Sequence, residues 1–186
     1  DQEGFTRFFH DLYGNVLQAL NYPDDVQEGV AWLWSEWQAG ERLRLFDDSL
    51  SALKRLSKAG FLLGVISNWD LTFERMLDRL NVRDFFAFTI SSIQMGIAKP
   101  DPRLFQYALE KTGASANQSW YMGDQIEADI QPAAALGFKT ILVDYYDKVC
   151  DGHAAHYVAP SMSVAAEIIC AAENGNPNVS QSVLER

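Results

Sequence analysis

Residues 119–144 of this 186-residue chain read SWYMGDQIEADIQPAAALGFKTILVD, and this stretch decides the fold. An apolar run ends at Asp124, an Ala-rich helical segment stops at Gly137, and a second apolar run closes at Asp144. Short, continuous apolar runs that alternate with amphipathic helices are typical of parallel strands buried on both faces by crossover helices. The stretch therefore predicts one strand–helix–strand unit of a parallel sheet.

The same alternation begins at about residue 44 and predicts an α/β fold with a doubly wound, Rossmann-like parallel sheet. Gly60 and Gly137 suit the left-handed conformation that ends helices. Asp101 can accept the free amides of a first helical turn, and Pro102 follows where a missing N–H costs nothing. The predicted helices are 49–59, 71–80, 102–112 and 163–172, and the predicted strands are 61–67, 85–91, 119–123, 139–144 and 156–159.

The first 43 residues differ from the rest of the chain. Between residues 5 and 39, aromatic and aliphatic side chains recur every three or four positions, which is helical spacing. A break at residues 21–25 divides them into a predicted antiparallel pair of helices, with an Asp to cap the second. Trp32, Trp34 and Trp37 either pack between these helices or line a substrate entrance. Packing is favoured, because aromatic residues at helical spacing are usually core.

Composition narrows the function classes. The formal net charge of -10, with 15 basic and 25 acidic residues, disfavours a nucleic-acid surface and favours small-molecule partners. Cys150 and Cys170 have no metal-ligand spacing, so two free thiols in a reducing compartment are expected. No apolar segment reaches the roughly 18 residues that cross a bilayer, and no signal peptide is evident. A cytoplasmic protein without membrane contact is predicted, and its oligomeric state stays open.

Polar residues follow several of the predicted strands, and the carboxyl ends of parallel strands are where ligands bind. Ser67 and Asn68 could hold phosphate oxygens or simply cap a helix. Lys99 could neutralise charge on a phosphoryl group or be an ordinary solvated lysine. Asp124 and Asp129 offer the hard oxygen ligands that Mg²⁺ takes. Together these residues predict a phosphate and metal site.

Three motifs in this order resemble the haloacid dehalogenase-like hydrolases, a large family of mostly Mg²⁺-dependent phosphatases. They are VISN at 65–68, GIAKPDPRLFQYAL at 96–109 and GDQIEADIQPAAALG at 123–137, and the resemblance runs from about Leu45 to Asp144. It implies a doubly wound sheet with a helical cap inserted after the first strand. By this resemblance, residues 1–43 are part of such a cap and residues 44–172 are the core. The remaining residues, 173–186, are expected to be a flexible tail.

The resemblance also implies a role for each site residue. Ser67 and the amide of Asn68 would bind the transferring phosphoryl oxygens, and Lys99 would stabilise their charge and that of the nucleophile. Asp124 would ligate Mg²⁺, and Asp129 would support either the metal shell or Lys99. The expected substrate is a small phosphorylated metabolite.

One part of the family's site is missing from the sequence. The family carries a strand-end D-x-D-x-[TV] motif whose first Asp is the nucleophile, and the nearest candidate, at residues 10–15, places Tyr13 where the second acid belongs. Asp11 is therefore interpreted as helix surface. In the family this strand lies between the strands that end at Ser67 and Asp124. Without it, these two strands would each expose unpaired backbone N–H and C=O groups in the interior, and every such group costs about 1 to 3 kcal/mol of stability. We therefore expect the chain, which begins at Asp1 rather than Met, to be an inactive fragment of a longer hydrolase.

Three hypotheses for the complete protein remain. In the first, an Asp carboxylate attacks a phosphomonoester and water hydrolyses the aspartyl phosphate. The second is a metal-independent 2-haloacid dehalogenase, which Asp124 and Asp129 argue against because a metal-free site has little use for paired acids. The third is a noncatalytic protein of the same fold that binds phosphate or regulates a partner.

Overall fold

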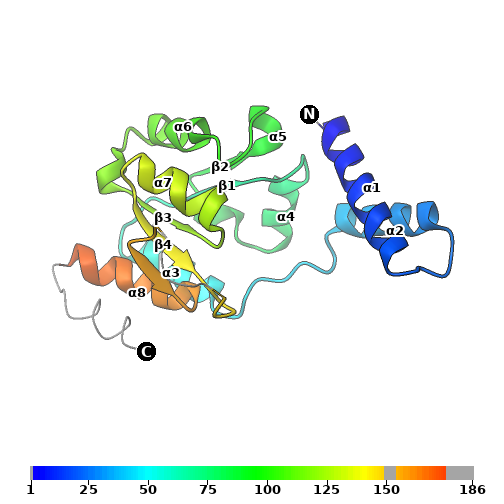
Figure 1. The fold of residues 1–186 in the computed structure, drawn as a ribbon. Helices are drawn as coiled ribbons and strands as arrows, with labels where there is room; N and C mark the ends of the chain where they lie inside the picture. The colour runs from blue at the N-terminus through cyan, green and yellow to red at the C-terminus, as the bar shows by residue number, and fades with distance from the viewer. Residues whose placement is uncertain (1, 149–153, 175–186) are drawn as a thin grey trace.

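A computed structural model describes residues 2–148 and 154–174. Five parallel strands form its core, with helices packed around them (Figure 1). The predicted α/β fold class is confirmed. The strands are β1 (Gly64–Ser67), β2 (Phe88–Ser91), β3 (Trp120–Gly123), β4 (Lys139–Val143) and β5 (Tyr157–Ala159).

These strands form two sheets. β1 pairs with β2, and Ser67 lies opposite Ser91 in the register. In the second sheet, β4 lies between β3 and β5, and Gly123 lies opposite Leu142. Every pair of neighbours is parallel, and among the described residues no strand joins β1 to β3.

Helices cover both faces of the sheets. Side chains alternate along β3, so that Trp120 and Met122 pack in the cluster of α3 and α8, whereas Tyr121 packs in the cluster of α6 and α7. This alternation is the physical basis of a doubly wound fold. The core helices are α3 (Ser49–Lys58), α4 (Phe73–Arg79), α5 (Ser92–Met95), α6 (Pro102–Thr112), α7 (Gln131–Ala135) and α8 (Met162–Glu173).

The local signals that fix these elements act as the sequence predicts. The carboxylate of Asp101 accepts the amide of Arg103 at the start of α6, and Gly60 and Gly137 have the positive φ angles expected after helices. The predicted strands 61–67 and 85–91 are shorter in the structure and begin at Gly64 and Phe88. Phe61, Leu63, Phe85 and Phe86, which precede these strands, are partly buried against the core without pairing in a strand, and a hydrophobicity pattern cannot distinguish such residues from a strand.

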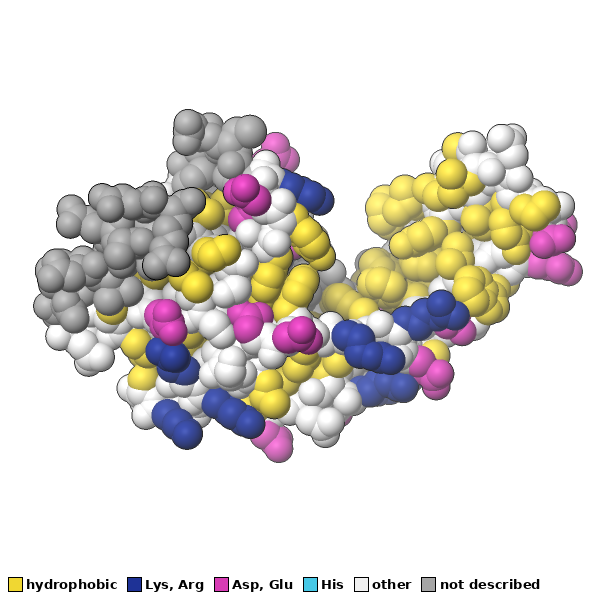
Figure 2. Space-filling view, turned by 90° about the horizontal axis from the view of Figure 1, so that it is seen from below, with side chains coloured by type: hydrophobic (Ala, Val, Ile, Leu, Met, Phe, Trp, Pro, Cys, Tyr) yellow, Lys and Arg dark blue, Asp and Glu magenta, His cyan; other side chains and the backbone are white. Residues whose placement is uncertain are grey.

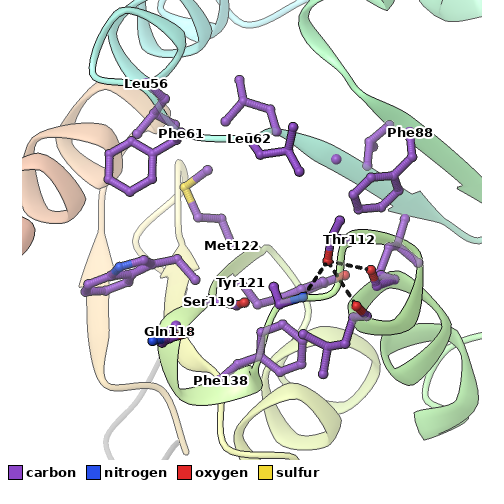
Figure 3. A pocket seen from close by; sticks show the side chains of 18 of the residues that line it. Leu56, Phe61, Leu62, Phe88, Thr112, Gln118, Ser119, Tyr121, Met122 and Phe138 are labelled. Carbon is purple, nitrogen blue, oxygen red and sulfur yellow. Dashed lines mark hydrogen bonds between the residues drawn. The ribbon is translucent and has the colours of Figure 1, made fainter.

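A cavity separates the two sheets. Its volume is about 360 Å³, and its lining includes β1 residues Gly64, Val65 and Ile66 and the facing residues of β3. Apolar side chains from both helical layers surround it, among them Leu56, Phe61, Met122 and Phe138 (Figure 3). The cavity is therefore bounded by one edge of each sheet and by the two hydrophobic clusters.

The N-terminal residues form a helical arm, which we define as α1 (Gln2–Ala19) and α2 (Val26–Ala39). Figure 1 shows the arm set apart from the core. Asp25 caps α2 by accepting the amides of Gln27 and Glu28, as predicted. The rings of Trp34 and Phe9 are 4.9 Å apart between the helices.

The other two members of the tryptophan group differ from Trp34. Trp32 is 52% exposed, whereas Trp37 contacts both α1 and the core ring of Trp69. The interpretation as inter-helix packing therefore describes Trp34 best.

No described helix has the length and apolar character needed to span a membrane. The predicted tail, residues 173–186, begins one residue too early, because Glu173 is the last residue of α8. Residues 175–186 of that tail lie outside the described residues.

Asp48 joins the first core helix to the last. Its carboxylate accepts the backbone amide of Ser163 at 2.7 Å and the hydroxyl of Tyr145 at 2.8 Å. Burial alone would raise the pKa of Asp48, but these hydrogen bonds outweigh it and hold the pKa below its usual value. The ionised carboxylate of Asp48, which directly precedes α3, thus accepts an amide from the first turn of α8.

We predict that Asp48→Asn lowers the unfolding free energy of the protein by about 1 kcal/mol at neutral pH, because an amide has only one acceptor oxygen for these donors. A lowered folded-state pKa gives stability that is present above pH ~4 and is lost as pH falls through the folded pKa. The difference in unfolding free energy between wild type and variant, measured by urea unfolding, should therefore shrink below pH ~4. A gap that stays constant with pH would contradict this role.

Candidate active site

Two loops at the carboxyl ends of strands are joined by a pair of reciprocal hydrogen bonds. Ser67 is the last residue of β1, and Asn68 follows it. The Asn68 side-chain amide donates to the carbonyl of Lys99 at 3.0 Å, and the Lys99 amide donates back to Asn68 Oδ1 at 2.7 Å. The backbone at Lys99 is thus fixed beside the end of β1, next to Ser67.

Lys99 and Asp129 form a buried ion pair. Lys99 Nζ lies 2.5 Å from Asp129 Oδ1, and the two side chains are 12% and 3% exposed. A buried pair of charges is stable only when further hydrogen bonds satisfy the carboxylate. The Tyr121 hydroxyl donates to the same Oδ1 at 3.0 Å, and the Gln125 amide donates to Oδ2 at 3.1 Å.

The protonation of Tyr121 is fixed by its surroundings. Burial, followed by the nearby carboxylates of Asp129 and Asp124, raises the pKa of Tyr121 far above that of free tyrosine. The hydroxyl therefore stays protonated and acts as a donor to Asp129. Tyr121 was not among the predicted site residues, because one tyrosine in the apolar run WYMG has the pattern of a core aromatic.

The backbone after β3 brings Asp129 to this position. Residues Ile126–Ile130 form a π-helical turn, a rare geometry found often at functional sites. It folds the Asp129 side chain against Gly123, where an added Cβ atom would lie only 2.4 Å from Asp129 Cβ. The absence of a side chain at Gly123 is therefore what allows Asp129 to reach Lys99.

Asp124 differs from Asp129 in its exposure. It directly follows β3 and is exposed, so its oxygens are open to solvent. Among residues 2–148 and 154–174, no three His, Cys, Asp or Glu side chains are arranged to hold a metal ion. Asp129 is already engaged by three donors. Of the two predicted metal ligands only Asp124 is open to solvent, and the described residues do not by themselves fit Mg²⁺.

The predicted site residues are therefore brought together unequally. Asn68, Lys99 and Asp129 form one hydrogen-bonded network. Ser67 directly precedes Asn68, and Asp124 directly precedes Gln125, whose amide binds Asp129. Asp11 lies exposed on α1, which confirms that it is helix surface. A second acid, Asp70, was not predicted as important, although it lies three residues after Ser67 and is fully buried.

The fold and these side chains define a Rossmann-like α/β protein with a polar site at the carboxyl ends of its strands. The sequence matches the family described as Haloacid dehalogenase-like hydrolase over residues 2–143, and the chain belongs to that family.

Curated relatives include phosphatases. The glyceraldehyde 3-phosphate phosphatase of Methanocaldococcus jannaschii is 33% identical over 169 residues, which cover 89% of this chain and 72% of the relative. The ribulose-1,5-bisphosphate 5-phosphatase of Halopiger xanaduensis is 30% identical and matches over 76% of this chain and 61% of its own length. The haloacid dehalogenase-like hydrolase domain-containing protein 3 of Danio rerio is 32% identical, with 78% and 60% covered. The chain thus spans only 60–72% of the length of these three relatives.

Solved structures share the fold. A dehalogenase with an intermediate complex has a TM-score of 0.76 and 18% identity, and the match covers 88% of this chain and 72% of that one. The HAD-hydrolase YfnB from Bacillus subtilis, bound to magnesium, has a TM-score of 0.75 and 20% identity, with 87% and 71% covered. At these identities the likeness shows the fold alone.

We predict that Gly123→Ala lowers kcat of the hydrolase at least tenfold, because a methyl group there displaces Asp129 and with it Lys99. Gly14→Ala is the matched control, since the nearest atom to an added Cβ is 3.9 Å away. Steady-state kinetics would measure both variants. Equal kcat values for the two would show that Asp129 does not need this space.

Tyr121→Phe removes one hydroxyl and keeps the ring that packs against Phe105 at 4.9 Å. We expect kcat to fall about tenfold, because Lys99 is held less firmly, and the melting temperature to fall as well, because the buried Asp129 carboxylate loses one of its donors. Tyr107→Phe, at an exposed position on α6, is the control. A melting temperature that drops while kcat is unchanged would assign Tyr121 to packing only.

Proposed function

We propose that the complete protein is a phosphomonoester phosphatase that works through an aspartyl phosphate. The observation that carries this proposal is the buried Lys99, held by Asp129 and fixed by Asn68 beside Ser67. A cation positioned in this way, with little water around it, suits the charge of a transferring phosphoryl group. The names of the two phosphatase relatives support the same reaction.

Each residue has a role in the proposed reaction. The Ser67 hydroxyl and the backbone amide of Asn68 bind phosphoryl oxygens, because both lie at the carboxyl end of a parallel strand. Lys99 Nζ offsets the charge that develops on phosphorus and on the attacking carboxylate. Asp129 and Tyr121 keep the ammonium group in place. Water then attacks the aspartyl phosphate and releases inorganic phosphate.

The nucleophile is proposed to come from a strand outside this chain. The cavity between β1 and β3 is lined mostly by apolar residues and is bounded by the edge of each sheet, which suits a strand buried on both faces. A strand there would end between Ser67 and Asp124. In this proposal, residues 44–172 are a core that lacks its first strand.

The arm supports the same conclusion. Four apolar side chains spaced four residues apart form an exposed stripe along α1 and its end, and side chains with this spacing share one helix face. Such a stripe suits a partial cap, residues 1–43, whose other part would cover it. The stripe residues are Phe8, Leu12, Val16 and Leu20, which are 62%, 44%, 41% and 72% exposed.

Mg²⁺ is proposed only for the complete protein. Asp124 would be the ligand from this chain, and acids of the added strand would supply the others; Mg²⁺ would contribute a positive charge at the phosphoryl oxygens. The proposed substrate is a small phosphorylated metabolite in the cytoplasm. The net charge of -10 favours such a partner over nucleic acid.

We predict that Lys99→Ala lowers kcat of the full-length protein by roughly 10² to 10³ on a phosphate ester. Lys111→Ala is the matched control, because this lysine is exposed on α6. Hydrolysis would be followed by phosphate release, with and without a chelator. Unchanged turnover in Lys99→Ala would refute the proposed role.

The same assay separates the remaining hypotheses. Activity that survives the chelator on a 2-haloacid, but is absent on phosphate esters, would indicate a metal-independent dehalogenase. Binding of phosphate without turnover of either substrate would indicate a noncatalytic protein. Residues 1–186 alone are predicted to hydrolyse neither, because they lack the nucleophile.

A further inference from the structure

Asp70 is a fully buried acid with no part in the proposed reaction. It lies between β1 and α4, three residues after Ser67, and its relative exposure is 0%. A buried carboxylate is strongly unfavourable unless hydrogen-bond donors compensate for the lost water. The identity of those donors indicates what Asp70 does.

The two oxygens of Asp70 bind different parts of the molecule. Oδ1 accepts the amide and the hydroxyl of Thr72, at 2.8 and 2.5 Å, from the start of α4 in the core. Oδ2 accepts Trp37 Nε1 at 3.3 Å and Gln38 Nε2 at 3.0 Å, both from α2 in the arm. One carboxylate therefore joins the arm to the core.

Trp69, which lies between Asn68 and Asp70 in the chain, also contacts both the arm and the core. The ring of Trp69 stacks on Trp37 with centroids 4.8 Å apart and 23° between the planes. Its indole N–H donates to the Thr72 hydroxyl, so the hydroxyl proton is directed at Asp70. Trp69 directly follows Asn68, and only one peptide bond separates the arm contact from the proposed phosphate-binding segment.

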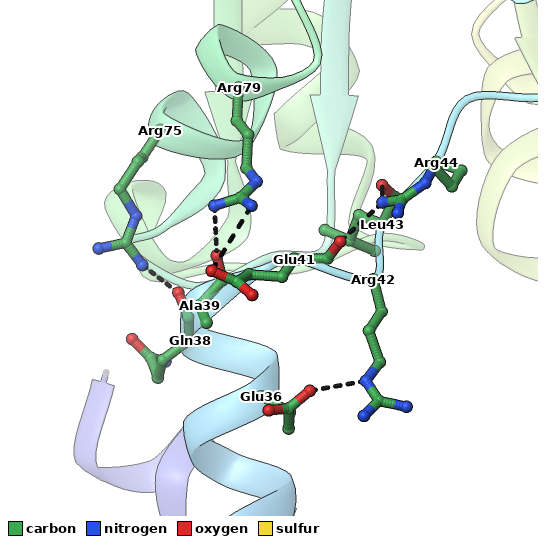
Figure 4. Close-up of polar contacts among 9 residues, drawn as sticks. All are labelled: Glu36, Gln38, Ala39, Glu41, Arg42, Leu43, Arg44, Arg75 and Arg79. Carbon is green, nitrogen blue, oxygen red and sulfur yellow. Dashed lines mark hydrogen bonds and ion pairs between the residues drawn. The ribbon is translucent and has the colours of Figure 1, made fainter.

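The end of α2 is held on α4 by further contacts (Figure 4). Arg75 donates to the carbonyl of Gln38, and Arg79 donates to the carbonyl of Ala39 at 3.2 Å. Cations at a helix C-terminus complement its negative dipole end. Gly40 is packed so closely on Met76 that an added Cβ atom would lie 2.1 Å from the sulfur. Asp70 is a buried, acidic member of this joint.

We propose that Asp70 is a positioning residue that sets the arm against the segment carrying Ser67 and Asn68, and thereby determines which leaving groups fit. Figure 2 shows the molecule hollowed between the arm and the core, and in this proposal the leaving group of a phosphate ester extends into that hollow. The substrate part of this inference rests on the proposed function. An ester that reaches the arm depends on Asp70, whereas a small ester that binds only the core does not.

The position requires a carboxylate. All four neighbouring groups donate, so an asparagine amide would face donors whichever way it turned. Gln38 can rotate its own amide, but the Trp37 indole N–H and the Thr72 backbone N–H cannot reverse. Asp70→Asn therefore leaves one buried donor unsatisfied and weakens the joint.

The first measurement is circular dichroism of the full-length protein. Stacked indoles give an exciton-coupled signal, which Trp37→Phe and Trp69→Phe should each abolish and which identifies the pair. We expect Asp70→Asn to reduce this signal by at least half. Asp48→Asn is the control, because Asp48 also accepts an amide and a hydroxyl but joins α3 to α8. It should keep the full signal.

The second measurement uses phosphate esters of increasing leaving-group size, beginning with methyl phosphate. For Asp70→Asn we expect KM to rise about tenfold for the large esters, the factor that one unsatisfied buried donor gives, and less than twofold for methyl phosphate. An intact indole signal, or an equal change for all esters, would overturn the proposal. If Asp70→Asn does not fold, Gln38→Met removes one arm donor and should change both readouts in the same direction.

The two proposals fail in different ways. If the wild-type protein hydrolyses no phosphate ester, the proposed function fails. In that case the indole signal alone decides whether Asp70 sets the joint, because it needs no substrate.

Discussion

The ion pair between Lys99 and Asp129 is the interaction on which the site depends. Both side chains are almost out of contact with water, so their attraction must exceed a large loss of hydration, and it does so only with further donors on the carboxylate. Tyr121 and the Gln125 amide supply them. The same arrangement makes the ammonium group useful, because a fixed charge in a dry site needs no reorganisation when charge develops on a substrate.

This constraint explains several features of the surrounding chain. Asp129 reaches Lys99 because a π-helical turn follows β3 and because Gly123 leaves room for its side chain. Asn68 fixes the backbone of Lys99 through two hydrogen bonds made by its side-chain amide group. Two strands from different sheets are thus joined through polar contacts at their carboxyl ends, although no ladder of hydrogen bonds connects β1 and β3.

Much of this could be predicted from the sequence, and the physical reasons for the exceptions are clear. Strand and helix alternation, the caps Asp25 and Asp101, and the polar strand ends all depend on local patterns. Tyr121 was missed because a tyrosine in an apolar strand has the same pattern whether or not its hydroxyl has a polar partner. Asp70 was missed because its arm donors are more than 30 residues away. The four residues of α5 are too few to show helical periodicity.

The segment after β1 has to satisfy two demands at once, which limits how it can vary. In the proposed function its first residues, Ser67 and Asn68, present a hydroxyl and a backbone amide to a ligand. Trp69 and Asp70 contact the arm through the indole stack and the shared carboxylate. A substitution that changes the contact with the arm also shifts the residues assigned to the ligand, since both groups lie within four consecutive residues. The arm is thus joined to the segment that directly follows β1, whose residues Gly64, Val65 and Ile66 line the cavity between the sheets. In the proposed function, a strand entering that cavity would meet a site whose cation, Lys99, is already fixed.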